Sequence, residues 1–201
     1  MLLTRVLVRS LGASASLEVS RSWRVSFSRV GSGILVDGRQ VNVEVHAPER
    51  LAPLARIEER RVEHGVVPLQ LDRHGLIRGE ATPAIGRELD RAVATAREMF
   101  ASAGFREALR GEEQGYLQVL QKSAQSLVSR VPRDLLYPQD LDWRERRALE
   151  LPSGLRGELN VHFSAQLCPG KSLLAHSSRL VETRIGETAQ ISSEEWHLRE
   201  G

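Results

Sequence analysis

The sequence predicts an α+β fold: a curved antiparallel β-sheet of about eight strands, interrupted by an inserted helical hairpin that packs on one face of the sheet. Three observations lead to this prediction. Apolar and polar side chains alternate with a period of two near both ends of the chain, turn sequences separate the alternating runs, and the middle third changes to helical spacing. We therefore expect one domain over residues 1–201, whose sheet is either a packed core sheet or a half-barrel.

The first 47 residues predict three strands. Residues 3–9 form the first strand and residues 10–16 its loop. Odd-numbered positions from 17 to 27 are mostly apolar and even-numbered ones are polar, which is typical of a half-buried strand. The sequence Gly-Ser-Gly at 31–33 predicts a tight turn, and residues 34–45 return as the third strand. Asp37 and Gly38 mark a bulge in that strand or, alternatively, a second turn.

Residues 48–81 predict a short helix and a small hairpin. Apolar residues at positions 51, 54 and 57 recur among charged residues, and we expect the helix to end near Gly65. Asp72 and Gly75 occupy the first and fourth positions of a turn between two short strands.

Residues 82–132 predict the helical hairpin. Thr82 is suited to cap the first helix and Pro83 to occupy its first position. Pro132 ends the second helix. Two helices so close in sequence are expected to pack as an antiparallel pair.

The last third is expected to return to strands after an irregular bridge over residues 133–152. A loop made of the sequence Pro-Gly-Lys would pair Leu159 with Val181 and place both on one apolar face. The parity of the apolar residues changes later in the chain, so we expect a bulge near Ser193 and Glu194.

Composition excludes several classes of protein. Hydrophobic residues make up 41% of the chain, and 28 basic residues nearly balance 26 acidic ones, so disordered and collagen-like chains are excluded. No run of 18 apolar residues occurs, so we expect no transmembrane segment. The six arginines of residues 1–47 are spaced apart with few aromatic residues between them, and nucleic-acid binding is therefore not expected.

The sequence gives little indication of the cellular compartment. Cys168 is the single cysteine and cannot form an internal disulfide. The apolar stretch between Arg5 and Arg9 is too short for the core of a signal peptide, which favours a cytoplasmic protein. A presequence or a truncated start would instead fit a periplasmic or organellar protein.

No motif predicts catalysis, a cofactor or a metal site. Zinc-protease spacing, the phosphate-binding loop, Cys-x-x-Cys and the dinucleotide glycine pattern are missing from the sequence. His162 and His176 are expected to lie diagonally on one sheet face, where two ligands without a third make a poor metal site. The other four histidines lie at segment ends, and we assign them no role.

Two arginines interrupt otherwise apolar stripes. Arg21 lies within the stripe of the second strand, and Arg179 lies within a stripe near the end of the chain. A buried guanidinium needs a carboxylate, a phosphate or several carbonyl groups to offset its desolvation. The partner is either a bound anion or an internal acid such as Glu182 or Glu195. In a third arrangement the guanidinium lies in water at a sheet edge.

We therefore expect a non-catalytic binding module that holds an apolar or acidic amphiphilic ligand, or a partner's apolar segment, between the sheet and the helices. The predicted ligand-binding residues are Arg21, Trp23, Phe27, Phe163, Arg179 and Val181. The first alternative is a structural or protein-interaction domain with a fully packed core, and the second is an enzyme of unrecognised type. A cavity of about 300 Å³ or more lined by the aromatic and aliphatic members of this set would favour the binding module.

Overall fold

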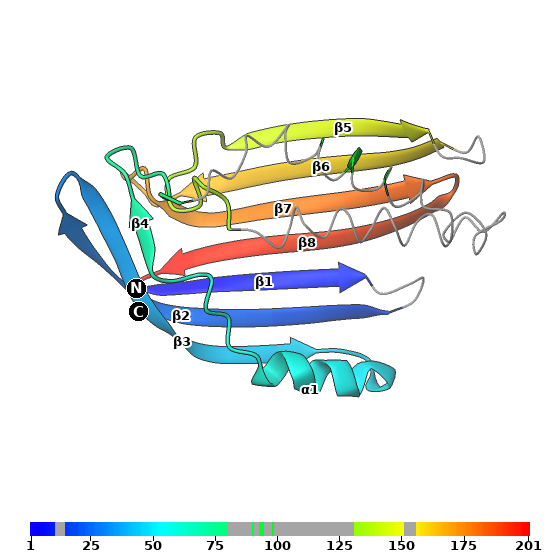
Figure 1. Cartoon of the computed structure of the whole chain (residues 1–201), viewed down its shortest axis with the longest axis horizontal. Coiled ribbons are helices and arrows are strands. Elements are labelled where there is room, and N and C mark those ends of the chain that lie inside the picture. The colour runs from blue at the N-terminus through cyan, green and yellow to red at the C-terminus, as the bar shows by residue number, and fades with distance from the viewer. Residues whose placement is uncertain (11–14, 80–89, 91–92, 95–97, 99–130, 151–155) are drawn as a thin grey trace.

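In the part of the chain that the structure describes, eight antiparallel strands form one sheet, as the sequence predicts. They are β1 (Leu2–Ser10), β2 (Ser16–Val30), β3 (Gly33–His46), β4 (Leu69–Leu71), β5 (Asp142–Glu150), β6 (Arg156–Leu167), β7 (Leu174–Ile185) and β8 (Thr188–Arg199). Their order is β4-β3-β2-β1-β8-β7-β6-β5, so β4 and β5 are the edges and the sheet is not closed (Figure 1). This computed structural model describes residues 1–10, 15–79, 90, 93–94, 98, 131–150 and 156–201.

The N-terminal strands confirm the predicted alternation. Odd-numbered residues of β1 and β2 are largely buried, and we call the face that carries them the inner face and the opposite one the outer face. Gly31 begins the turn between β2 and β3 with a φ of 59°, which favours glycine. β3 is one continuous strand, and its bulge lies at Val41, opposite Ser22 and Trp23, rather than at Asp37 and Gly38.

A short helix follows the first three strands. The 3-10 turn Glu49–Leu51 leads into α1 (Ala52–Arg60), which lies beside β3 (Figure 1). The helix ends before the predicted Gly65. The predicted turn beyond it is present: the Asp72 carboxylate accepts hydrogen bonds from the backbone N–H groups of His74 and Leu76.

The predicted helical hairpin over residues 82–132 lies almost entirely outside the described residues. Asp90, Val93, Ala94 and Glu98 are described and are helical. Asp90 accepts a hydrogen bond from Arg147 of β5 at 3.0 Å. In the described part of the chain, no helix is long and apolar enough to cross a membrane.

The irregular bridge predicted over residues 133–152 is wrong in its second half, because β5 runs over Asp142–Glu150. This strand is rich in charged residues of both signs and lies at an edge of the sheet, where charged side chains are common. Charged residues of this kind have low strand propensity, so the strand was not expected.

The predicted pairing of β6 with β7 is shifted by two residues. Leu159 lies opposite Thr183, and Val181 lies opposite Val161. A shift of two keeps the side chains on their predicted faces over most of the ladder, because strand side chains repeat with a period of two. At the turn end a further irregularity between Gln166 and Leu167 changes the parity, and Leu174 is fully buried where Leu173 was expected.

The bulge predicted near Ser193 and Glu194 is absent. The ladder of β8 with β7 runs without a break from His176 opposite His197 to Ile185 opposite Thr188. Even-numbered residues of β8 lie on the inner face throughout, so this face contains the polar residues Gln190, Ser192 and Glu194, while Ile191 is exposed on the outer face.

One end of the inner face is an apolar core. Its buried residues come from β1, β2, β3 and β8, from residues 66–71, which include β4, and from residues 135–136 and 174. Trp23 and Trp196 are both almost completely buried there and stack with their ring centroids 6.3 Å apart.

Candidate functional site

A hollow of about 360 Å³ lies on the inner face, away from the apolar core. It is lined by Arg5, Leu7, Arg9, Val19, Arg21, Glu58, Arg61 and Glu63. β1 supplies three of these residues and β2 supplies two, because residues two apart on a strand share a face. The remaining three come from α1 and the residues that follow it.

Two of the lining arginines form ion pairs inside the hollow. The Nη2 atom of Arg21 lies 2.8 Å from Oε2 of Glu58 and also donates to the Glu58 carbonyl oxygen at 2.9 Å. Arg61 lies 3.7 Å from Glu58 and 3.4 Å from Glu63. The charges of Arg21 and Arg61 are therefore balanced by the two lining carboxylates.

Arg5 is balanced by a carboxylate outside the lining. Its Nε donates to Oε1 of Glu194 at 2.8 Å, and its guanidinium lies 5.1 Å from the centroid of the Trp196 ring. Arg179 approaches the other oxygen of the same carboxylate at 3.9 Å. Burial raises the pKa of the Glu194 carboxyl, and Arg179 and Arg5 oppose that shift.

Arg9 is the lining guanidinium that these acids leave unbalanced. It forms no ion pair within the described part of the chain, and its Nε is buried without a hydrogen-bond partner. Burial lowers the pKa of Arg9; Glu58 opposes the shift, and the guanidiniums of Arg5, Arg61 and Arg21 add to it. The hollow is therefore a cationic site with one guanidinium available to an anion.

The six predicted ligand-binding residues share the inner face but are spread over it. Arg21 alone among them lines this hollow. Trp23 belongs to the apolar core and Phe27 packs against that core. Phe163 stacks on Trp143 of β5 with ring centroids 5.6 Å apart, two strands away from β8.

The two predicted anchor arginines have internal acids as partners. Arg21 pairs with Glu58 and Arg179 approaches Glu194, whereas Glu182 and Glu195 were the acids suggested by the sequence. Glu194 was missed because it was assigned to a bulge.

Arg9 was missed although a signal was present. It shares the parity of Leu3, Arg5 and Leu7 on β1, so the same alternation that identified Arg21 places it on the inner face.

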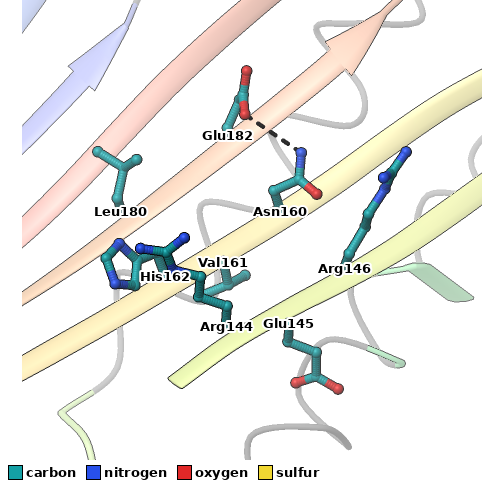
Figure 2. A pocket seen from close by; sticks show the side chains of 8 residues that line it. All are labelled: Arg144, Glu145, Arg146, Asn160, Val161, His162, Leu180 and Glu182. Atoms are coloured by element: carbon teal, nitrogen blue, oxygen red, sulfur yellow. Dashed lines mark hydrogen bonds between the residues drawn. The ribbon is translucent and has the colours of Figure 1, made fainter. Parts of the chain in front are cut away.

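A second hollow, of about 430 Å³, lies over β5, β6 and β7 (Figure 2). Arg144, Arg146, His162 and Leu180 are among its lining residues. It is the weaker candidate, because many of its polar groups are bonded to each other or to neighbouring side chains.

Several of these bonds involve charged groups of the second hollow. Arg146 pairs with Glu158, and the His162 Nε2 lies 3.3 Å from Oδ2 of Asp142. Hydrogen bonding from Arg184 lowers the pKa of Glu182.

The predicted diagonal contact between His162 and His176 is wrong. His162 lies opposite Leu180, and His176 lies opposite Gln166, because of the register shift described above. His176 instead lies beside His197 of β8, a residue to which the sequence analysis gave no role.

No protein-family model matches the chain, and no curated protein matches it.

Proposed function

We propose that the protein is a non-catalytic binding module whose inner hollow holds the anionic group of an amphiphilic ligand, with Arg9 as the anchor. One observation carries the proposal: Arg9 is a partly desolvated guanidinium without an ion-pair partner in the described part of the chain, in a hollow where every acid already has a basic partner.

The chemistry of the guanidinium favours a carboxylate or a phosphate as the bound group. Removing an unpaired charge from water is costly, and an anion that accepts two hydrogen bonds from the planar guanidinium offsets this cost. The Nε of Arg21 is also buried without a partner, which adds a second donor near the same place.

The hollow also offers an apolar surface to the hydrophobic part of the ligand. Leu7 and Val19 lie opposite each other on β1 and β2, and both line the hollow. In this proposal the open sheet acts as a half-barrel that covers one side of the ligand. The volume is within the lower part of the range of ordinary ligand sites, about 300–1,000 Å³.

The test compares ligands that share an alkyl chain of similar length and differ in the head group. Decanoic acid and decyl phosphate are titrated into the full chain by isothermal calorimetry, with decanol as the uncharged match. We expect both anions to bind and decanol to bind more weakly. Arg9→Met should weaken anion binding by about 10- to 100-fold, as expected for the loss of hydrogen bonds to a charged group.

The control is Arg24→Met, which changes an exposed arginine on the outer face of β2. Its affinity should equal that of the parent chain. Equal binding of decanol and decanoic acid, or unchanged anion binding by Arg9→Met, would overturn the proposal.

A structural or protein-interaction domain is the second candidate. It is favoured by the apolar core, where Trp23 and Trp196 are closely packed by other buried residues. Native mass spectrometry of freshly purified protein separates the two candidates, since a co-purified acidic amphiphile supports the first and its absence, with no binding in the titrations, supports the second.

A further inference from the structure

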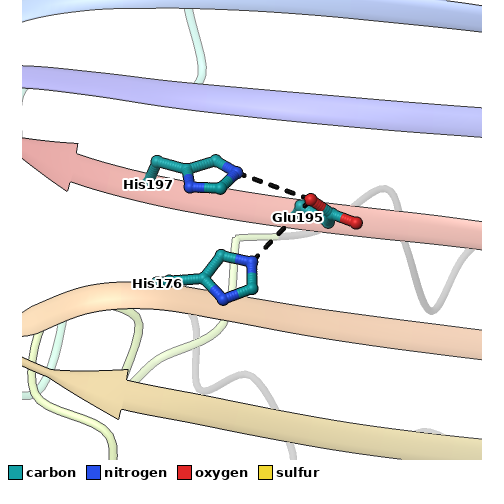
Figure 3. Close-up of side chains that lie close together, drawn as sticks. All are labelled: His176, Glu195 and His197. Carbon is teal, nitrogen blue, oxygen red and sulfur yellow. Dashed lines mark ion pairs between the residues drawn. The ribbon is translucent and has the colours of Figure 1, made fainter.

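Three side chains that can bind a metal converge on the outer face of the sheet. They are His176 on β7 and Glu195 and His197 on β8 (Figure 3). His176 lies directly opposite His197 in the ladder, and Glu195 precedes His197 by two residues, so all three share one face. The two imidazole rings stack with their centroids 4.5 Å apart.

The separations between the ligand atoms are close to those found around a bound ion. Oε2 of Glu195 lies 3.4 Å from Nε2 of His197 and 3.7 Å from Nε2 of His176. Ligands bound to Zn²⁺ at about 2.0–2.1 Å in a tetrahedron are separated from each other by about 3.4 Å. All three ligand atoms lie within 4.8 Å of one another.

The histidines are suited to act as ligands. The Nε2 of His176 is buried and makes no hydrogen bond. A neutral imidazole has a free lone pair, which is the form that binds a metal.

We propose that His176, Glu195 and His197 form a binding site for a divalent transition-metal ion, with Zn²⁺ as the ion that best fits the donor set. Two imidazole nitrogens and one carboxylate oxygen provide three ligands, and the position facing solvent takes a water molecule. The site lies on the outer face of the sheet, whereas the Arg9 hollow lies on the inner face. The proposed metal site therefore does not depend on the function proposed above.

The test uses the full chain without a histidine tag. Zn²⁺ is titrated in competition with a chromophoric chelator, and Co²⁺ is added in a parallel experiment as a spectroscopic probe. We expect one Zn²⁺ per chain and intense visible absorption from four-coordinate Co²⁺. His176→Ala and His197→Ala should each weaken Zn²⁺ binding by at least about 100-fold, because losing even a group that supports a metal ligand costs about 10- to 100-fold.

His162→Ala is the matched control. His162 lies on the same face and also has a carboxylate neighbour, Asp142, but it is not part of the converging group. Its Zn²⁺ affinity should equal that of the parent chain. Thermal melts of all three variants in EDTA establish that they are folded, and Glu195→Gln provides a variant that preserves side-chain shape.

Two results would overturn the proposal. One is the absence of stoichiometric Zn²⁺ binding by the parent chain. The other is an equal loss of affinity in His162→Ala and His176→Ala, which would indicate weak binding by scattered surface histidines.

Discussion

Arg5 and Arg21 lie directly opposite each other on β1 and β2, and each guanidinium is held by a different carboxylate. Arg5 pairs with Glu194 of β8, and Arg21 pairs with Glu58 of α1. Like charges at such a cross-strand position destabilise a sheet unless they are compensated. The pair therefore couples the stability of the inner face to two acids that are distant in sequence.

Glu194→Gln should destabilise the protein strongly. The side chain is 1% exposed, and its loss of charge leaves Arg5 and Arg179 without their shared carboxylate. Breaking a buried ion pair by changing one partner costs about 3–5 kcal/mol. Urea unfolding measures the change, and Glu187→Gln, in the exposed turn before β8, should stay within about 0.5 kcal/mol of the parent.

Arg9→Met and Arg21→Met should have opposite effects on stability. Arg9 has no carboxylate to leave behind, so a methionine of similar length should keep or raise the free energy of unfolding. Arg21 donates two hydrogen bonds to Glu58, and its loss should cost about 1–3 kcal/mol. Thermal melts without added ligand compare the stabilities of the two variants with that of the parent chain. A large loss of stability in Arg9→Met would contradict the assignment of an unpaired charge.

Phe163→Ala should cost about 3–5 kcal/mol, the range for removing a large buried aromatic side chain. Phe163 is 8% exposed and stacks on Trp143. The control is Leu180→Ala, which removes a 39% exposed side chain on the outer face of the neighbouring strand and should change little. Similar midpoints for both variants in denaturant would mean that the inner face is loosely packed near β5.

Asp72→Asn should make the melting temperature of the protein less dependent on pH in the acid range. Hydrogen bonds from the backbone of Leu76 and His74 lower the pKa of Asp72 in the folded chain. A carboxyl with a lowered folded pKa stabilises the protein above its unfolded pKa, about 3.9, and this contribution is lost as the pH falls through the folded pKa. Melting temperatures of the parent and the variant should therefore differ at neutral pH and converge in acid. A constant difference at every pH would show that the charge is unimportant.

Periodicity predicted the faces of the strands well, because an error of two residues in register does not change a face. This is why Phe163 and Val181 lie on the inner face as expected, although Leu159 and Val181 are not partners. Periodicity failed at β8, because the inner face there is polar and an apolar residue, Ile191, points outward.

The candidate site was less predictable than the fold. Its key pairs, Arg5 with Glu194 and Arg21 with Glu58, join elements far apart in the chain, and a single sequence has no pattern that reports such contacts. The three-residue group on the outer face depends on the pairing of β7 with β8, which the expected bulge had misplaced.

The order of the strands also decides how the chain can assemble. β1 to β3 pair as neighbours in sequence, and so do β5 to β8, and within the described residues the strands of the two blocks pair with each other where β1 meets β8. The Arg5–Glu194 contact between these two strands joins residues that are 189 positions apart in the sequence. During synthesis on the ribosome, β1 therefore waits with an unpaired edge until β8 has emerged, so folding of the whole sheet is expected to be slow and its first block prone to aggregate.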